Sequence, residues 1–463
     1  MKPRILIVML GLFASVVNAG QPVVAGNDEV NEYVLSNGLK LIVRVDHRAP
    51  VVVSQVWYRV GSSYEPSGLT GVSHLLEHMM FKGTGKLAPG EFSRIIASLG
   101  GRDNAFTGRD YTAYYQQLEK SHLERAFELE ADRMRNLIID DAELEKERQV
   151  VVEERRLRVD DSPQSLLHEH FNATAFETSP YQHPVIGWMD DIQAYRLDEV
   201  LGWYRRWYAP NNAIVVVVGD VQPEAVLRLA ERHFGPVAPS PGIRLKLRDE
   251  RPQTGPKRIV VRKAAQVPQL LMGYKVPSVS TAKSEWEPYA LAVLAAVLDG
   301  DESARLSRHL IRGAEVAAGA SAGYSLNDRL TTLFTLGGTP APGRTLTELE
   351  QGLIKELQRL QREPVTADEL GRIKTQVVAE NVYGRDSMFY QAMRLGLLET
   401  VGVGWQRADE FVDRIRAVTA EQVQAVARQY LTEDRLTVAE LQPLDADASA
   451  SAAAPPEGGD RAH

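Results

Sequence analysis

The sequence predicts an α+β fold that consists of two similar halves, in each of which helices cover a mixed sheet. Its 463 residues exceed what a single core usually holds and suit two domains of about 200 residues each. Residues 237–256 are rich in proline and charge and show no periodicity, which is typical of a linker. The order of strands and helices in residues 28–236 begins again in residues 257–442. This repetition indicates two homologous halves, although the residue identity between them is weak.

The first half opens with strands and continues with helices. Asn37-Gly38 lies between two alternating runs, which is typical of a β-hairpin, and a third strand follows. Residues 101–118 alternate again, as exposed strands do. We predict helices through Phe81, over 91–99, 123–134 and 141–159, and up to Tyr208, and then a buried strand at 211–221.

The second half repeats this order. Strands are predicted at 257–264, 268–277 and within 323–338, with a helix at 285–298. Residues 443–463 have low complexity, so we expect a disordered tail. The remaining predicted elements are helices through Leu360, Gln376, Leu398 and Val426 and a strand at 436–441.

The N-terminus predicts an exported protein. Lys2 and Arg4 precede an apolar run at 5–17, and small residues end at Ala19, which is typical of a signal peptide over residues 1–19. We expect cleavage after Ala19 and a periplasmic or secreted mature chain. No other apolar stretch approaches the roughly 18 residues that a membrane span needs. A formal charge of −8 without a basic stripe gives no support for nucleic-acid binding.

The stretch "SHLLEHMMFKGT", residues 73–84, has two histidines four apart with a glutamate directly before the second. On a helix, His74, Glu77 and His78 share one face, and the apolar residues around them face the other side. Imidazoles on successive turns can bind one metal ion. The alternative is a solvated helix face, but an accidental match to this motif has a chance of on the order of one or two in a hundred.

A catalytic zinc site needs a third protein ligand besides two imidazoles. Because the chain has no cysteine, that ligand must be a carboxylate or another histidine. On the helix predicted for 141–159, Glu154 lies on an apolar face, where a carboxylate is costly unless a positive charge meets it. Glu153 is the rival ligand, and a salt bridge to an arginine is the alternative role for Glu154. The less regularly spaced alternatives are His168, His170 and His183.

These residue types predict metal-assisted hydrolysis. Zinc bound by two histidines and a glutamate lowers the pKa of its water to about 7 and polarises a peptide carbonyl. Glu77 is placed to accept the proton of that water and to pass it to the leaving amine. Glu147, two turns before Glu154, is placed to orient a ligand histidine. We expect one zinc ion per chain, although such ligands also accept other divalent ions.

At this point the sequence resembles the pitrilysin/insulinase family of inverted-motif zinc peptidases, whose members include the mitochondrial processing peptidase β subunit and bacterial two-chain relatives. The resemblance covers nearly the whole mature chain and rests on "HLLEHMMFKGT", "ERQVVVEE", "NAFTGRDYTAYY" and "SPYQHPVIG". It implies two homologous α/β sandwich halves that close like a clam shell on an unfolded peptide. The implied zinc ligands are His74, His78 and Glu154, with Glu77 as the catalytic base and Glu147 as a supporting acid.

The resemblance also suggests where a peptide substrate binds. The strand with Asn104, Ala105 and Phe106 resembles the edge to which relatives add their substrate as an extra strand. Such main-chain pairing gives affinity with little sequence preference. The alternative is an ordinary paired strand.

One departure from the family concerns the second half. In active single-chain relatives this half carries an arginine and, seven residues later, a tyrosine that hold the substrate carbonyl and its developing oxyanion. The resemblance places Ile311 and Ala318 at those positions. Loss of an oxyanion donor costs roughly 100- to 1000-fold in rate. Shifting the register to Arg305, Arg308 or Arg312 brings no tyrosine seven residues later.

The chain has a complete metal motif but lacks the arginine and tyrosine, so we predict that two subunits share the catalytic groups. The chain is expected to be the zinc-bearing subunit of a heterodimer, and a homologous subunit would supply the arginine and tyrosine. The sequence thus predicts a zinc endopeptidase that acts on extended or unfolded peptides. A non-hydrolytic peptide-binding clamp or assembly scaffold of the same fold is the alternative, although a scaffold has no need to retain the metal motif.

Overall fold

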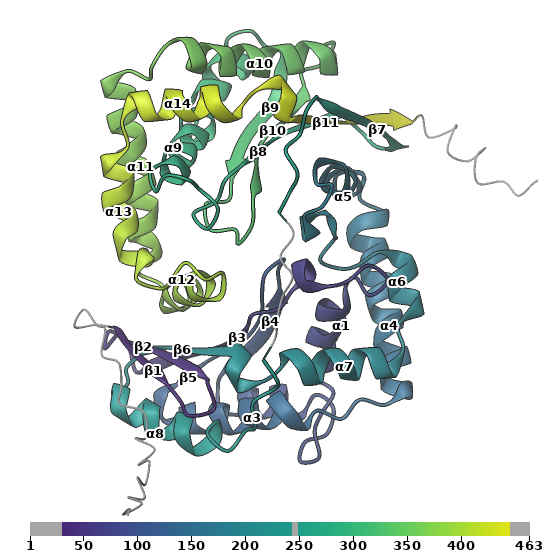
Figure 1. The fold of residues 1–463 in the computed structure, drawn as a ribbon, viewed down its shortest axis with the longest axis vertical. Helices are drawn as coiled ribbons and strands as arrows, with labels where there is room; N and C mark the ends of the chain where they lie inside the picture. The colour runs from purple at the N-terminus through teal and green to yellow at the C-terminus, as the bar shows by residue number, and fades with distance from the viewer. Residues whose placement is uncertain (1–29, 243–248, 445–463) are drawn as a thin grey trace, which may run out of the picture.

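The computed structural model describes residues 30–242 and 249–444. Figure 1 shows two lobes that face each other, and each lobe is one sheet with its covering helices. The predicted signal peptide lies outside the described residues. Within the described ranges, no helix is both long enough and apolar enough to cross a membrane.

The first lobe contains a six-stranded sheet. The predicted hairpin is confirmed: Val34 lies opposite Lys40, and Gly38 adopts a φ of 88°, which favours glycine. The strands are β1 (Val30–Val34), β2 (Lys40–Val45), β3 (Val51–Tyr58), β4 (Arg102–Thr107), β5 (Thr112–Glu119) and β6 (Ala213–Gly219). Their order across the sheet is β1-β2-β6-β3-β5-β4, so β1 and β4 are the edge strands.

Helices cover this sheet and fill the space beside it. They are α1 (Val72–Met79), α2 (Glu91–Ser98), α3 (Leu123–Asn136), α4 (Asp141–Arg155), α5 (Pro163–Ala175), α6 (Met189–Ala194), α7 (Leu197–Trp207) and α8 (Pro223–His233). The predicted helix through Phe81 ends at Met79, and the helix predicted for 141–159 continues beyond α4 as a π-helical turn, Arg156–Asp160.

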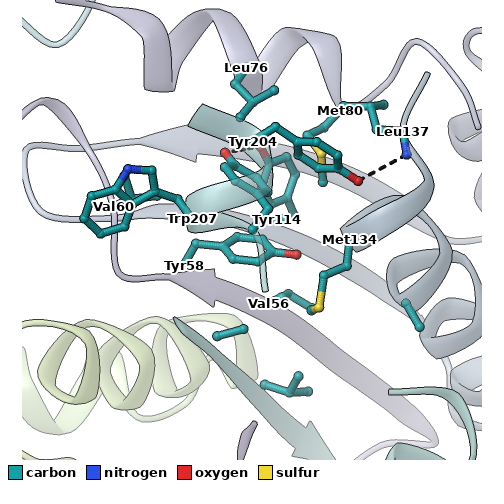
Figure 2. Close-up of a cluster of buried hydrophobic side chains, with 14 of the residues drawn as sticks. Val56, Tyr58, Val60, Leu76, Met80, Tyr114, Met134, Leu137, Tyr204 and Trp207 are labelled. Atoms are coloured by element: carbon teal, nitrogen blue, oxygen red, sulfur yellow. Dashed lines mark hydrogen bonds between the residues drawn. The ribbon is translucent and has the colours of Figure 1, made fainter. Parts of the chain in front are cut away.

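The main core of the first lobe lies between the sheet and these helices. Figure 2 shows aromatic side chains in this core, among them Tyr58, Tyr114 and Trp207. The rings of Tyr58 and Tyr208 stack with 4.3 Å between their centroids. The hydroxyl of Tyr204 accepts a hydrogen bond from the backbone N–H of Leu137 at 3.1 Å. This bond gives the buried phenol of Tyr204 a polar partner, which matters because an unpaired hydroxyl in a core is costly.

The second lobe contains a five-stranded sheet in the order β7-β11-β8-β10-β9. Its strands are β7 (Lys257–Ala264), β8 (Gln269–Val276), β9 (Ala317–Tyr324), β10 (Thr332–Pro340) and β11 (Leu436–Leu444). Its helices are α9 (Glu287–Asp299), α10 (Leu346–Arg362), α11 (Ala367–Gly384), α12 (Met388–Thr400), α13 (Arg407–Ala417) and α14 (Ala420–Tyr430).

Three predictions for this lobe need correction. Strand β9 begins at Ala317, before the predicted range, because its residues are mostly small and carry no alternating pattern. Helix α13 was not predicted as a separate element. Pro443 and Leu444 belong to β11 instead of the predicted tail, since they pair with Lys263 and Ala264 of β7. The rest of the predicted tail lies outside the described residues.

The two lobes exchange helices. From the first lobe, α5 packs its Phe171 against β8 and β11 of the second sheet. From the second lobe, α12 packs its Leu395 against β3 and β6 of the first sheet. Each sheet therefore has one face covered by a helix from the other lobe, which ties the two halves into one body.

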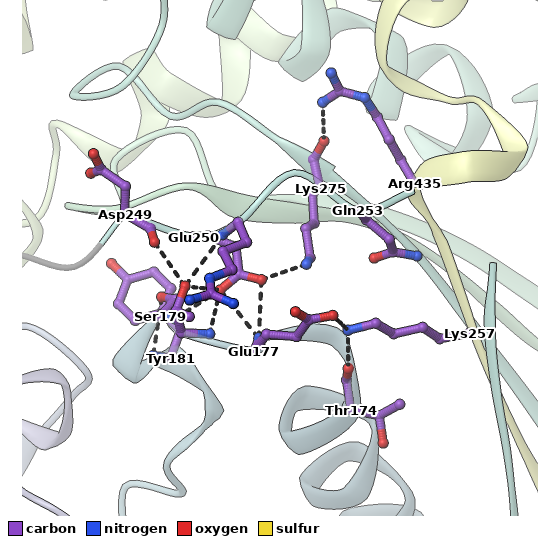
Figure 3. Close-up of polar contacts among 12 residues, drawn as sticks. Thr174, Glu177, Ser179, Tyr181, Asp249, Glu250, Gln253, Lys257, Lys275 and Arg435 are labelled. Carbon is purple, nitrogen blue, oxygen red and sulfur yellow. Dashed lines mark hydrogen bonds and ion pairs between the residues drawn. The ribbon is translucent and has the colours of Figure 1, made fainter. Parts of the chain in front are cut away.

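The described part of the predicted linker forms no helix or strand, but one of its side chains is firmly held. The Glu250 carboxylate forms an ion pair with Lys275 of β8, and the two side chains are 2% and 6% exposed. It also accepts hydrogen bonds from the backbone N–H groups of residues 177–179. Figure 3 shows Glu250 between these two partners. The linker thus fastens the segment after α5 to the second sheet.

Candidate metal centre

Helix α1 presents the motif residues on one face because its other face is deeply buried. Val72, Leu75, Leu76 and Met79 have no exposed surface, as the helical spacing predicts. The carboxylate of Glu65 accepts hydrogen bonds from two N–H groups at the start of the helix, at 2.6 and 2.8 Å. Burial raises the pKa of Glu65 to about 7, although these N–H groups favour its charged form. The first turn of α1 is therefore fixed.

Helix α4 carries the carboxylates predicted for the site. Its N-terminus is capped by Asp140, whose side chain accepts the N–H of Glu143. Glu147 is buried beside Val151, and Glu154 lies two turns further along, partly exposed. The predicted apolar face is only partly buried, since Val150 is 47% exposed. Val150 and Glu154 instead line a cavity of about 1230 Å³.

The structure brings His74, His78 and Glu154 together. Oε2 of Glu154 lies 3.7 Å from Nε2 of His74 and 3.3 Å from Nε2 of His78. One ligand atom from each residue lies within 4.8 Å of the other two. Nδ1 of His74 is buried and has no hydrogen-bond partner among the described residues. Two imidazole nitrogens and one carboxylate oxygen are the donor set of a catalytic zinc site, so these residues fit such an ion.

Charges at this centre are strongly coupled. Burial disfavours the charged ring of His78, but Glu147 and Glu154 outweigh it and raise the pKa of His78 to about 9. Burial, reinforced by the charge of His78, lowers the pKa of His74 to about 4. The hydrogen bond from His78 holds the pKa of Glu154 below its ordinary value. Each of these three groups therefore changes the pKa of at least one of the other two.

Glu147 contacts the opposite side of a ligand histidine. Its Oε2 lies 3.2 Å from Nδ1 of His78, and its other oxygen forms an ion pair with Lys82. Burial acts against the charged carboxylate, but His78 and Lys82 outweigh it and lower the pKa of Glu147. A carboxylate in this position fixes both the orientation and the tautomer of the imidazole.

Glu77 lies in the same cavity and is held from the edge strand. Its Oε2 accepts a hydrogen bond from the hydroxyl of Thr107, the last residue of β4. Burial raises the pKa of Glu77, and the bond from Thr107 only partly offsets this effect. A half-desolvated carboxylate with a raised pKa is suited to accept and return a proton.

The edge strand β4 forms one wall of the cavity. Asn104, Ala105 and Phe106 line it together with Thr107. Strand β4 pairs only with β5, so its other edge has no strand partner among the described residues. The ring of Phe106 packs edge to face on Trp57 at 5.4 Å. The Ala105 N–H on this strand donates to Oδ1 of its neighbour Asn104 at 2.9 Å. An unpaired edge of this kind is where an extended segment can be added to a sheet.

The alternative ligands do not join the ligand cluster. The Glu153 side chain is 60% exposed and forms an ion pair with Arg156. His168 and His183 line the cavity without joining the ligand cluster, and His170 is exposed and does not line it. Among the described residues, the group of His, Asp and Glu side chains close enough to share an ion is the predicted one.

The positions at which the resemblance places the arginine and tyrosine belong to the second lobe and do not line this cavity. Ile311 ends a π-helical turn in the second lobe, and Ala318 lies on β9. The nearby Arg305 is committed to an ion pair with Glu369. Every described residue that lines the cavity belongs to the stretch from His74 to Ile186, so the second lobe contributes none.

Sequence reasoning missed three side chains that hold the predicted ones. Thr107 anchors Glu77, Lys82 pairs with Glu147, and Arg158 pairs with the free oxygen of Glu154. One of them carried a usable signal: Arg158 lies four residues after Glu154, one helical turn away. Lys82 lies beyond the end of α1 and contacts a residue of another helix, so no local spacing predicts its contact. The contact of Thr107 crosses from a strand to a helix, and no local spacing predicts it.

Comparison with known proteins identifies the family. Residues 40–187 match the model of insulinase (peptidase family M16), and residues 195–377 match that of the peptidase M16 inactive domain. The chain is 34% identical over 363 residues to zinc protease PqqE of Helicobacter pylori, covering 76% of this chain and 79% of that protein. The chain belongs to peptidase family M16. This membership supports a peptidase function.

Solved structures agree with the family fold. A protease from Helicobacter pylori superposes with a TM-score of 0.84 and 30% identity, over 90% of this chain and 100% of that chain. The periplasmic protease PqqL from Escherichia coli superposes with a TM-score of 0.76 and 18% identity, over 95% of this chain. This chain spans 50% of the PqqL chain, so at that identity the likeness concerns the fold alone.

Proposed function

We propose that this chain is a zinc-dependent endopeptidase that hydrolyses extended or unfolded peptides. The observation that carries the proposal is the convergence of Nε2 of His74, Nε2 of His78 and Oε2 of Glu154 in the cavity that also holds Glu77. Membership of family M16 supports it, and the Helicobacter pylori relative is named a zinc protease.

Each residue of the centre has a role in this proposal. His74, His78 and Glu154 would hold the ion, and Glu147 keeps the ring of His78 in place through Nδ1. Bound zinc supplies Lewis-acid polarisation of the peptide carbonyl and acidifies a water molecule. Glu77 accepts the proton of the attacking water and passes it to the leaving amine, and Thr107 keeps the Glu77 carboxylate directed into the cavity.

The substrate binds as an added strand on β4. Its backbone pairs with the free edge at Asn104, Ala105 and Phe106, next to Thr107 and Glu77. Because main-chain hydrogen bonds do not depend on side chains, many sequences can bind in this way. Only an unfolded or extended segment can present its backbone to the edge, which restricts cleavage to such segments.

A second subunit completes the site. The cavity lining comes only from the first lobe among the described residues. The resemblance places Ile311 and Ala318 of the second lobe at the positions of the family's arginine and tyrosine. A homologous subunit that faces the cavity would bring these two groups. The chain alone is expected to cleave peptides roughly 100- to 1000-fold more slowly than the pair. Full turnover by the isolated chain contradicts this part of the proposal.

The last part of the proposal is that the chain is exported to the periplasm or out of the cell and that residues 1–19 are removed. It is supported by the charged and apolar residues before Ala19. The fold relative PqqL is named a periplasmic protease.

Metal analysis and peptide cleavage test the central proposal. The purified chain is expected to contain about one zinc ion, and Glu77→Gln is expected to keep that ion but lose turnover on an unstructured peptide. Glu77 is not a ligand, so metal content and activity should separate in this variant. A chain that is purified without metal and shows no turnover argues instead for a peptide-binding clamp, whereas unchanged activity of Glu77→Gln contradicts the role of Glu77 as the base.

A further inference from the structure

The cavity around the candidate metal centre contains one arginine whose guanidinium forms no ion pair with a carboxylate of the described residues. Three lining carboxylates have arginine partners: the pairs are Glu153–Arg156, Glu154–Arg158 and Glu169–Arg155. Of these three arginines, Arg158 itself lines the cavity, and Arg109 lines it as well. Within residues 30–242 and 249–444, no carboxylate lies within ion-pair distance of its guanidinium, and none of its side-chain donors forms a hydrogen bond.

Arg109 is nevertheless held in position. Its guanidinium carbon lies 5.0 Å from the centre of the Tyr181 ring. That ring has no exposed surface, and its hydroxyl donates a hydrogen bond to Asp110, so it offers a rigid platform. The backbone of Arg109 is fixed as well, because its carbonyl accepts the N–H of Ser63 at 2.8 Å. A restrained cation loses little side-chain entropy when it binds an anion.

The acidic groups on neighbouring segments are occupied by other donors. The Asp110 carboxylate forms an ion pair with Arg329, whose Nε lies 3.0 Å from Oδ1. The Asp328 carboxylate accepts hydrogen bonds from the hydroxyls of Ser325 and Thr332 at 2.6 and 2.5 Å. The charge of Arg109 also acts on Asp328, but from beyond ion-pair distance. The donors of the cavity arginine therefore remain available to a bound molecule.

Arg109 lies just beyond the end of β4, the strand on which the substrate is proposed to bind. Thr107 ends β4 and contacts Glu77, so the bond to be cleaved lies near this residue. Arg109 follows Thr107 by two positions, which is at most about 7 Å along an extended backbone. A peptide paired with β4 would bring a side chain within reach of Arg109 no more than about three residues from the cleaved bond.

We propose that Arg109 binds an aspartate or glutamate side chain of the substrate close to the cleaved bond, so that this peptidase prefers acidic peptides. The inference rests on the proposed function and specifies its substrate class. Pairing with the edge of β4 gives affinity for peptides of any sequence, whereas Arg109 gives the preference for acidic side chains. A guanidinium is suited to this task because it binds a carboxylate through two parallel hydrogen bonds.

Binding and cleavage of matched peptides test the inference. Two unstructured, C-terminally amidated fluorescent peptides differ only in carrying glutamate or lysine at the three positions on either side of one bond. Amidation removes the C-terminal carboxylate, so the two peptides differ in carboxylates only through their side chains. Binding is measured on zinc-loaded Glu77→Gln chain, and kcat/KM on the unsubstituted chain, with its partner subunit where turnover requires it. We expect at least about tenfold preference for the glutamate peptide in both measurements.

Charge reversal provides the decisive variant. Arg109→Glu is expected to bind the lysine peptide better than the glutamate peptide, and Arg109→Gln to lose the preference. Arg206→Glu is the matched control, because Arg206 also stacks on an aromatic ring, Trp207, but is exposed and does not line the cavity. Its preference should equal that of the unsubstituted chain. Zinc content reports whether each variant is folded.

The possible outcomes separate this inference from the proposed function. Charge-dependent binding without cleavage overturns hydrolysis by this chain and leaves the role of Arg109 intact. Cleavage without charge dependence, or with the same preference in Arg109→Glu, overturns the role of Arg109 alone. Absence of binding to either peptide overturns both.

Discussion

At the scale of single residues, a change at Glu147 shows how strongly a residue that contacts a metal ligand affects zinc affinity. Its carboxylate lies 3.2 Å from Nδ1 of His78 and orients that ring. Glu147→Gln removes the charge that holds the imidazole, so we expect zinc affinity to fall about 10- to 100-fold. A competition titration with a chelator measures the change. Glu153→Gln is the control on the same helix, since Glu153 is 60% exposed and pairs with Arg156. Equal affinities in the two variants contradict the role of Glu147.

The protonation of His78 makes metal binding depend on pH. Its pKa is raised to about 9 in the metal-free protein, whereas a zinc ligand must be a neutral imidazole. Binding near pH 7 should release about one proton, and the apparent affinity should weaken about tenfold for each pH unit below the pKa. His74, with its pKa lowered to about 4, is already neutral and adds nothing.

Calorimetric titrations with zinc in buffers of different ionisation enthalpy count the released proton. The Glu147→Gln variant should release fewer protons, because Glu147 is one of the groups that raise the pKa of His78. An affinity that does not change between about pH 6 and pH 8 is the contrary result.

At the scale of elements, the exchanged helix α12 depends on one glycine. A Cβ at Gly396 would lie 2.2 Å from the indole of Trp57 on β3, a contact too short for the buried ring to accommodate. Gly396→Ala should therefore destabilise the protein by about 1–3 kcal/mol, although alanine is the better helix former. Urea unfolding monitored by tryptophan fluorescence measures the change.

Gly202 in α7 offers the matched control. A Cβ there meets nothing within 4 Å, so Gly202→Ala should be neutral or stabilise by up to about 1 kcal/mol. If both substitutions stabilise the protein, α12 is not packed against Trp57 as closely as described.

The sequence predicts those elements of the fold and of the candidate site that depend on residues close in the chain. The face shared by His74, Glu77 and His78 follows from helical geometry, and the hairpin at Gly38 follows from turn chemistry, because both depend on residues close in the chain. The exchange of α5 and α12 between lobes could not be predicted. Their apolar faces indicate burial but not the partner, which is chosen by tertiary packing. The small residues of β9 gave no periodic signal at all.

At the scale of the whole molecule, Glu250 connects the lobes. Its carboxylate and the Lys275 ammonium are almost fully buried, so Glu250→Gln leaves a charge without a partner. We expect a loss of about 3 kcal/mol in the free energy of unfolding, and the double change Glu250→Gln with Lys275→Met should recover much of it. Arg344→Gln is the control, because the Arg344–Glu348 pair is exposed and should contribute at most about 1 kcal/mol.

The dependence of this loss on pH identifies its cause. Burial favours the neutral form of Glu250, but Lys275 and the backbone N–H groups outweigh it and hold the pKa below its ordinary value of 4.5. A carboxyl whose pKa is lowered on folding stabilises the protein above the unfolded pKa, and this contribution disappears as pH falls through the folded pKa. Because glutamine does not titrate, the difference in unfolding free energy between the unsubstituted chain and Glu250→Gln should shrink on acidification below about pH 4.5. A difference that stays constant in urea unfolding from neutral to acidic pH means that packing, and not the charge of Glu250, holds the lobes together there.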